Sequence, residues 1–302
     1  MRYVAVLSLV LIIGFSPALG QAPAALDVRQ DGLVAHLHRP ARLGRAPAVV
    51  LVGGSGGGIG WQDEMAGLLA ERGFAAMALA YFGMDGLPKE LERIPLEYFD
   101  RALAALAKQP DVDPKRIAIG GVSKGGELAL LIASRHPEIR GVAVFVPSGI
   151  VFQSVAAGYP KTSSWSFRGR ELPFVPYGKV DQPKSTADIY RAGLEQAERT
   201  KSLEKAIIPV ERIKGPILLM SGRDDNLWPS TQLCEMIVTR LRAHKFRYPV
   251  EHIAYPDAGH LISSIRRDDV TRRGGTAEGN RLAQEDGQRR FLEFFERLLK
   301  RK

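Results

Sequence analysis

Short apolar strands alternate with amphipathic helices along most of this chain, and this alternation constrains its fold more than any other feature. The strand AVVLV at Ala48–Val52 is apolar at every position, as expected for a strand buried on both faces. We expect further strands at Ala75–Ala80, Arg116–Gly120, Gly141–Val146, Pro216–Met220 and Val250–Tyr255. We expect helices at 62–72, 90–107, 126–135, 231–243 and 277–299. The pattern predicts an α/β fold, with a mainly parallel sheet covered by helices on both faces.

The composition of the chain fits one such globular domain. It has 302 residues, 45% hydrophobic and 25% charged, and α/β folds often use this length as a single domain. The single cysteine, Cys234, excludes an intramolecular disulfide and lies in a helical pattern that predicts a core position. The net charge of +9 is spread along the chain without a nucleic-acid recognition motif. We interpret it as a solvated basic surface and expect no nucleic-acid partner.

The first twenty residues have the features of a cleavable signal peptide. Arg2 gives a positive start, Tyr3–Phe15 is an apolar run, and small residues lead up to Gly20. We expect cleavage after Gly20, a catalytic domain at 21–302, and a periplasmic or secreted protein. The alternative is an uncleaved anchor, but the run is short for a membrane span of about 20 residues. No later stretch is apolar enough to span a bilayer.

Residues 150–210 interrupt the alternation between the fourth and fifth strands. A connection of this length usually has a function or is disordered. We expect an inserted lid with one helix near Asp188–Lys201, and the alternative is a decoration packed away from any site. Its aromatic residues would line an acyl or aryl pocket: Trp165, Phe167, Phe174 and Tyr177.

The segment GGVSKGGEL at 120–128 predicts a nucleophile. Gly121, Ser123 and Gly125 fit the pattern G-x-S-x-G between an expected strand and an expected helix. That context is typical of a nucleophile elbow, in which the turn strains the serine backbone and glycines leave room for it. The helix N-terminus adds a partial positive charge near the reacting oxygen.

A serine nucleophile needs a base, and the base needs a carboxylate. His260, in YPDAGH after the last expected strand, is our candidate base. The loop SGRDDNLWP after strand 216–220 offers two acids, of which Asp225 is preferred and Asp224 stays open. The order Ser123, Asp225, His260 is the nucleophile–acid–base order of the α/β-hydrolase fold.

Acyl transfer also needs hydrogen-bond donors for an oxyanion. We expect the backbone N–H of Lys124 and one from GGSGGG at 53–58, from Ser55 or Gly54. A phosphate cradle is the alternative for this glycine-rich loop, but the P-loop and G-x-G-x-x-G patterns are both missing. No sequence pattern indicates a metal, and we expect no cofactor.

These segments resemble the acyl-CoA thioesterase and bile acid-CoA:amino acid N-acyltransferase family, in its C-terminal catalytic domain. The resemblance rests on GVSKGGELALLIAS, SSWSFRGRELPFVPY, IPVERIKGPILLMSGRDDNLWPS, YPDAGHLI and GGT at 274–276. It runs from about Pro47 onward and implies Ser123, Asp225 and His260 as the catalytic triad. Amino-acid-conjugating members use cysteine at the elbow, so the serine favours hydrolysis to water.

We therefore expect an exported serine hydrolase that cleaves a small ester or thioester through an acyl-enzyme. Acyl transfer to an amine or alcohol is the first alternative, and a non-catalytic binding module is the second. The acyl group, the leaving group and the oligomeric state are not predicted.

Overall fold

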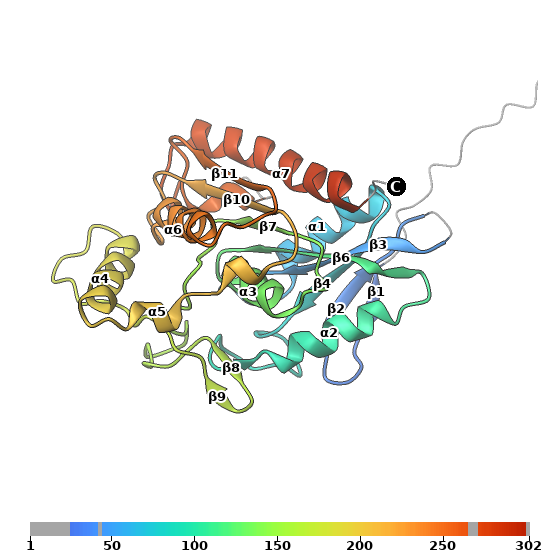
Figure 1. Cartoon of the computed structure of the whole chain (residues 1–302), viewed down its shortest axis with the longest axis horizontal. Helices are drawn as coiled ribbons and strands as arrows, with labels where there is room; N and C mark the ends of the chain where they lie inside the picture. Colours follow the sequence, from blue (N-terminus) through green and yellow to red (C-terminus); the bar gives the residue numbers. More distant parts are fainter. Residues whose placement is uncertain (1–24, 42–43, 265–270, 300–302) are drawn as a thin grey trace, which may run out of the picture.

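The computed structural model describes residues 25–41, 44–264 and 271–299. The expected signal peptide at 1–20 lies outside the described residues. Within them, the main sheet has eight strands in the order β1-β2-β4-β3-β6-β7-β10-β11 (Figure 1). The strands are β1 Leu26–Val28, β2 Val34–His38, β3 Ala46–Val52, β4 Ala75–Ala80, β6 Val112–Val122, β7 Val142–Phe145, β10 Ile217–Gly222 and β11 Val250–Tyr255. Only the β1–β2 and β2–β4 pairs are antiparallel, so the sheet is mainly parallel as predicted.

Helices cover both faces of this sheet, as the apolar strands require. On one face, α1 (Gly60–Glu71) and α7 (Ala277–Leu299) pack in a single apolar cluster with the sheet. On the other face lie α2 (Glu97–Ala107), α3 (Lys124–Arg135) and α6 (Ser230–Ala243) (Figure 1). Central strands such as β3 and β4 are buried along their whole length, because both sides of the sheet are covered.

The insertion between β7 and β10 is more structured than the sequence indicated. It contains α4 (Thr186–Arg199), a second helix α5 (Leu203–Ala206), and strands β8 (Trp165–Phe167) and β9 (Arg170–Glu171). The expectation of a single helix was therefore wrong. The two strands form a small sheet with β5 (Ile94–Pro95), which lies outside the insertion.

This pairing also changes the start of α2. The sequence predicted a helix over 90–107, but α2 begins at Glu97. Leu91 instead bridges to Val155, and Ile94 pairs with Trp165. Pro95 has no N–H for a helical bond, and long-range strand pairing replaces the first turns of the expected helix. A pattern read along the chain could not reveal partners some 70 residues away.

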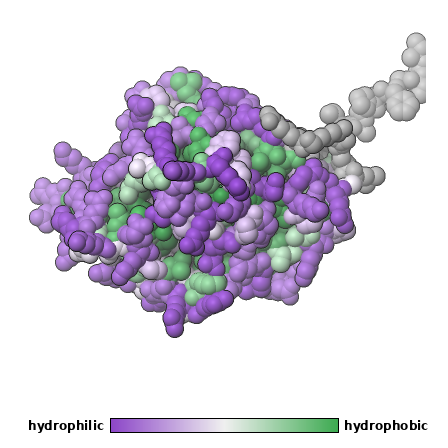
Figure 2. Space-filling view, in the orientation of Figure 1, coloured by the Kyte–Doolittle hydropathy of each residue, from purple (hydrophilic) through white to green (hydrophobic). Residues whose placement is uncertain are grey.

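The surface agrees with a globular domain of mixed composition. The face drawn in Figure 2 is mainly hydrophilic, and apolar residues show in small separate areas.

Cys234, predicted to be a core residue, is buried in α6, and burial raises the pKa of its thiol. Among the described helices, none has both the length and the apolar character needed to cross a bilayer.

Candidate active site

The loops that carry the candidate residues meet at the carboxyl edge of the main sheet. The sheet order reverses direction between β3 and β6, and open parallel sheets bind ligands at such a switch point. The glycine-rich loop follows β3, and Ser123 follows β6 directly. The loops after β10 and β11 bring Asp225 and His260 to the same edge.

Ser123 has the strained backbone of an elbow. Its φ of 57° and ψ of −123° lie in a region that L-residues rarely adopt. A Cβ on Gly121 would lie 2.4 Å from the Gly125 carbonyl oxygen, and one on Gly125 would lie 2.2 Å from that of Gly53. Both positions must therefore be glycine, because a side chain on Gly121 would clash with the first turn of α3 and one on Gly125 would clash with the end of β3.

Three side chains from three loops join in one hydrogen-bonded chain. The His260 Nε2 atom lies 2.9 Å from Ser123 Oγ, and His260 Nδ1 lies 2.8 Å from Asp225 Oδ2. A carboxylate only accepts, so Nδ1–H donates to Asp225 and the lone pair on Nε2 accepts from the serine hydroxyl. All three residues are at most 7% exposed, so little water competes for these bonds.

The structure distinguishes the two adjacent aspartates. The second oxygen of Asp225 accepts the backbone N–H groups of Leu227 at 2.9 Å and Trp228 at 3.2 Å. Asp224 is exposed, and its backbone N–H donates to the Ala258 carbonyl at 2.9 Å. Asp225, the preferred candidate, is the one that lies against His260.

A segment after the histidine holds the acid and base loops together. The Arg273 carbonyl accepts the N–H of Asn226 and that of His260, each at 3.1 Å. The buried Asn280 side chain accepts from Gly259 N–H at 2.8 Å and donates to the Gly274 carbonyl at 3.0 Å. Sequence reasoning missed Asn280, since an asparagine on a long amphipathic helix gives no local signal. The GGT motif at 274–276 was the nearest available clue.

Trp228 connects the insertion to the site. Its ring meets His260 edge-on at 6.0 Å between centroids, and its Nε1–H donates to the Val146 carbonyl at 3.1 Å. Phe152 and Tyr190 of the insertion pack against it, at 6.1 and 5.7 Å. The insertion is thus anchored beside the histidine through an apolar cluster of its own.

Two of the three expected oxyanion donors, Lys124 and Gly54, lie next to the serine. Lys124 is the first residue of α3, where a backbone N–H has no partner within the helix. Gly54 lies against the nucleophile, since a Cβ there would be 3.2 Å from Ser123 Cβ. Ser55 is half-buried in the same loop. Trp165, expected to line a pocket, is instead fully buried.

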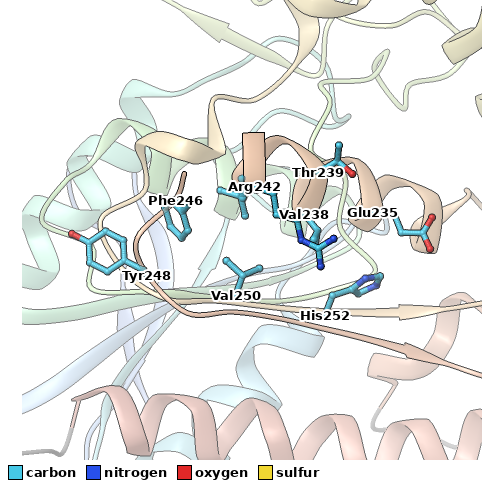
Figure 3. A pocket seen from close by; sticks show the side chains of 9 residues that line it. Glu235, Val238, Thr239, Arg242, Phe246, Tyr248, Val250 and His252 are labelled. Carbon is cyan, nitrogen blue, oxygen red and sulfur yellow. The ribbon is translucent and has the colours of Figure 1, made fainter. Parts of the chain in front are cut away.

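Three other histidines have partners away from Ser123 and Asp225. His36 and His38 both lie within hydrogen-bonding distance of Asp63, at 2.8 and 2.7 Å. His252 contacts Ser221 Oγ at 2.9 Å and lines an open groove of about 680 Å³ between α6 and β11 (Figure 3). The lining of this groove includes none of the three candidate residues. In the described part of the chain, no cluster of three or more His, Cys, Asp and Glu could hold a metal ion.

The sheet order, the elbow and the serine–histidine–aspartate geometry define a member of the α/β-hydrolase class. Solved structures agree on the fold. A putative dienelactone hydrolase from Klebsiella pneumoniae superposes with a TM-score of 0.57 at 19% identity, covering 90% of this chain and 97% of its own. An acylaminoacyl peptidase from Pyrococcus horikoshii gives 0.60 at 20% identity, covering 89% and 40%.

Within that class, the chain belongs to the family described as BAAT / acyl-CoA thioester hydrolase C terminal, whose model matches residues 94–301. Mouse acyl-coenzyme A thioesterase 1 is 35% identical over 237 residues, covering 78% of this chain and 54% of the relative. Mouse acyl-coenzyme A thioesterase 5 is 33% identical over 286 residues, covering 91% and 65%. The chain thus spans about half to two thirds of the length of these relatives.

Proposed function

We propose that this protein is a serine hydrolase that cleaves a thioester or ester through an acyl-enzyme on Ser123. The observation that carries the proposal is the hydrogen-bonded chain from Ser123 through His260 to Asp225, built on a strained elbow. The named activities of the similar mouse enzymes make acyl-CoA thioesters the first substrates to test.

In the first half of the reaction, His260 Nε2 takes the hydroxyl proton as Ser123 Oγ attacks the substrate carbonyl. Asp225 keeps the imidazole in the reactive tautomer and stabilises the imidazolium that forms. The backbone N–H of Lys124, with that of Gly54 or Ser55, stabilises the negative oxygen of the tetrahedral intermediate. One such donor typically contributes about 10²- to 10³-fold in rate.

Collapse of the tetrahedral intermediate breaks the bond to the leaving group. His260 returns its proton to the leaving thiol or alcohol, and the acyl group remains on Ser123 Oγ as an ester. A water molecule then enters and gives one proton to His260, which passes this proton to Ser123 Oγ when the second intermediate collapses. The water oxygen attacks the acyl carbon, the same N–H groups stabilise the second intermediate, and the free acid leaves.

The test of this proposal is covalent labelling combined with turnover. The protein is treated with a fluorophosphonate, the adduct is located by mass spectrometry, and p-nitrophenyl esters of increasing chain length are assayed beside acyl-CoA. We expect one adduct, on Ser123, and release of free acid. An amide or ester product with added amine or alcohol would favour acyl transfer instead, and an unlabelled, inactive protein would favour a binding module.

We also propose that residues 1–20 direct export of the chain. The proposal is supported by the positive start, the apolar run and the small residues before Gly20. Fractionation of a bacterial host that expresses the whole chain, followed by N-terminal sequencing, should give a periplasmic or secreted protein that starts at Gln21. Full-length protein in the cytosol would contradict it.

A further inference from the structure

A buried tyrosine holds the loop that carries one of the proposed oxyanion donors. Tyr81 follows β4 directly, is 2% exposed, and its hydroxyl donates to the Gly53 carbonyl at 2.7 Å. Its ring packs against Phe99 and Trp165, with centroids 5.6 and 5.8 Å away. The hydroxyl therefore has little freedom to move away from the Gly53 carbonyl oxygen.

Fixing that carbonyl also fixes the peptide next to the nucleophile. The Gly53–Gly54 peptide is planar and trans, so the N–H of Gly54 points opposite to the carbonyl that Tyr81 holds. A Cβ on Gly54 would be 3.7 Å from Ser123 Oγ, which places this peptide beside the reacting atom. The Tyr81 hydroxyl thus sets the direction of the Gly54 N–H. It also fixes the position of the backbone that leads to Ser55.

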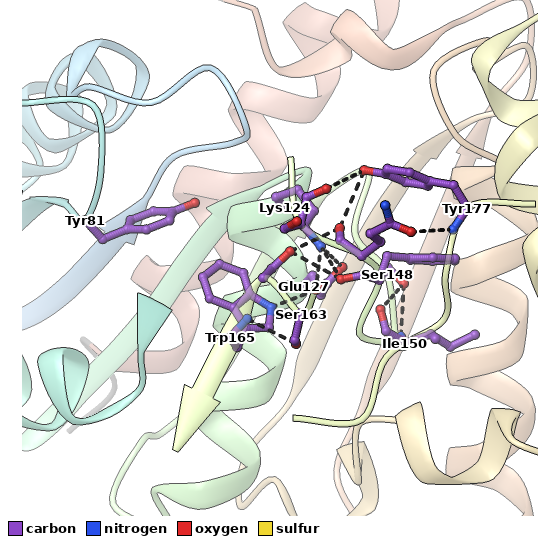
Figure 4. A network of polar contacts seen from close by, with 12 residues as sticks. Tyr81, Lys124, Glu127, Ser148, Ile150, Ser163, Trp165 and Tyr177 are labelled. Atoms are coloured by element: carbon purple, nitrogen blue, oxygen red, sulfur yellow. Dashed lines mark hydrogen bonds and ion pairs between the residues drawn. The ribbon is translucent and has the colours of Figure 1, made fainter. Parts of the chain in front are cut away.

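The second donor has a comparable support behind it (Figure 4). Lys124 Nζ donates to both oxygens of Glu127, at 2.8 and 2.9 Å, and reaches the Phe152 carbonyl at 3.4 Å. Trp165 Nε1–H donates to Glu127 at 2.7 Å from the insertion. The side chain of Lys124, whose backbone N–H is the second donor, is therefore held by both α3 and the insertion.

This ion pair has no simple explanation as a source of stability. Lys124 is 2% exposed and Glu127 0%, and burial lowers the pKa of the lysine and raises that of the glutamate. A buried ion pair is often no more stabilising than apolar side chains of similar volume. Lys124 directly follows the nucleophile, and its ion pair with Glu127 fixes the first turn of α3. The pair therefore contributes to the position of the Lys124 N–H rather than to stability alone.

We propose that the buried hydrogen bond of Tyr81 and the adjoining polar network of Lys124, Glu127 and Trp165 preset the oxyanion donors before substrate binds, with Tyr81 as the main positioning residue. This inference rests on the proposed hydrolase function. Donors that already point at the developing charge require no reorganisation during the reaction, which is the source of their large effect on rate. The network touches the peptides that carry the donors, and not the reacting atoms.

The deciding experiment is Tyr81→Phe, which removes the hydroxyl and keeps the ring. We expect kcat to fall about 10- to 100-fold, somewhat less than when an oxyanion donor is lost outright. KM should stay within about twofold, since the donors act mainly on the transition state. Inhibition by a trifluoromethyl ketone, which forms a tetrahedral adduct on the serine, should weaken by the same factor as kcat/KM.

Tyr98→Phe is the matched control. Its hydroxyl is also buried, donates to the Ala80 carbonyl at 2.6 Å and accepts the Val34 N–H at 3.0 Å, and these partners lie outside the oxyanion loop. We expect its Tm to fall at least as much as that of Tyr81→Phe, with kcat within about twofold of wild type. Trp165→Phe removes the donor to Glu127 and should lower kcat several-fold. This variant replaces Tyr81→Phe as the deciding test if Tyr81→Phe does not fold.

The outcomes separate this inference from the proposed function. An active wild type in which Tyr81→Phe matches Tyr98→Phe in kcat would overturn the positioning role and leave the hydrolase proposal intact. A rise in the KM of Tyr81→Phe with unchanged kcat would also overturn the positioning role. If Tyr81→Phe does not fold, an unchanged kcat in Trp165→Phe would overturn it. A wild type without labelling or turnover would overturn both proposals.

Discussion

Ser123→Ala should reduce ester and thioester turnover by at least about 10³-fold, to the residual level that binding and oxyanion donors alone provide. The change removes the nucleophilic oxygen that lies 2.9 Å from His260 Nε2 and adds no atom to the packed elbow. Alanine tolerates the positive φ of this turn about as well as serine, so folding should be retained. The measurement is kcat with p-nitrophenyl esters and acyl-CoA, with Tm recorded for the same sample.

Ser134→Ala is the control for this variant. Ser134 lies on the same helix, α3, is also buried, and its hydroxyl donates to the Leu131 carbonyl at 2.8 Å. Its loss should leave kcat within about twofold of wild type, because a single neutral hydrogen bond contributes mainly about 1 kcal/mol to stability. Full turnover by Ser123→Ala, with a normal Tm, would refute the acyl-enzyme mechanism.

Asp225→Asn should lower kcat by about 10³- to 10⁴-fold. An asparagine amide at this position can donate to Nδ1, which favours the imidazole tautomer with its proton on Nε2. That tautomer cannot accept the serine proton, and the imidazolium would also lose the negative charge beside it. The Leu227 and Trp228 N–H groups can still bond to the amide oxygen, so the loop should remain in place.

Asp224→Asn tests the choice between the two acids directly. It makes the same change in charge one residue away, on an exposed side chain, and kcat should stay within about twofold of wild type. Comparison of the two variants under identical conditions separates orientation of His260 from a general effect of charge at this loop. A larger loss in Asp224→Asn than in Asp225→Asn would reverse the assignment.

Two strands and the last helix have the bounds that the sequence predicted. β4 at Ala75–Ala80 and β11 at Val250–Tyr255 have the expected bounds, as does α7 at Ala277–Leu299. Burial on both faces makes a central strand such as β4 continuously apolar. β11 is a partly exposed edge strand, and its β-branched and aromatic residues carried the signal. A long amphipathic helix repeats its pattern over several turns. β6 starts earlier than expected, at Val112, because Ala46 of β3 pairs with that residue.

The insertion was the least predictable part of the chain. Its strands are two or three residues long, and β8 pairs with Ile94–Pro95 on the far side of the elbow in sequence. Such short elements form because a neighbouring backbone is already in place, so their own residues carry almost no signal. Trp165 illustrates this, since its burial depends on Tyr81, Phe99 and Glu127, which come from three other segments.

The sequence by itself determined the α/β architecture, the sharp turn at Ser123 and the chain order of the candidate nucleophile, acid and base. Each of these depends on local pattern: apolar runs, glycines around one serine, and loops directly after strands. Only the tertiary structure placed Asp225, and not Asp224, against His260, since neighbouring loop residues point in different directions and the loop's contacts select one. It alone brought Tyr81 behind Gly53, because a hydrogen bond between separate segments exists only once the sheet has aligned them.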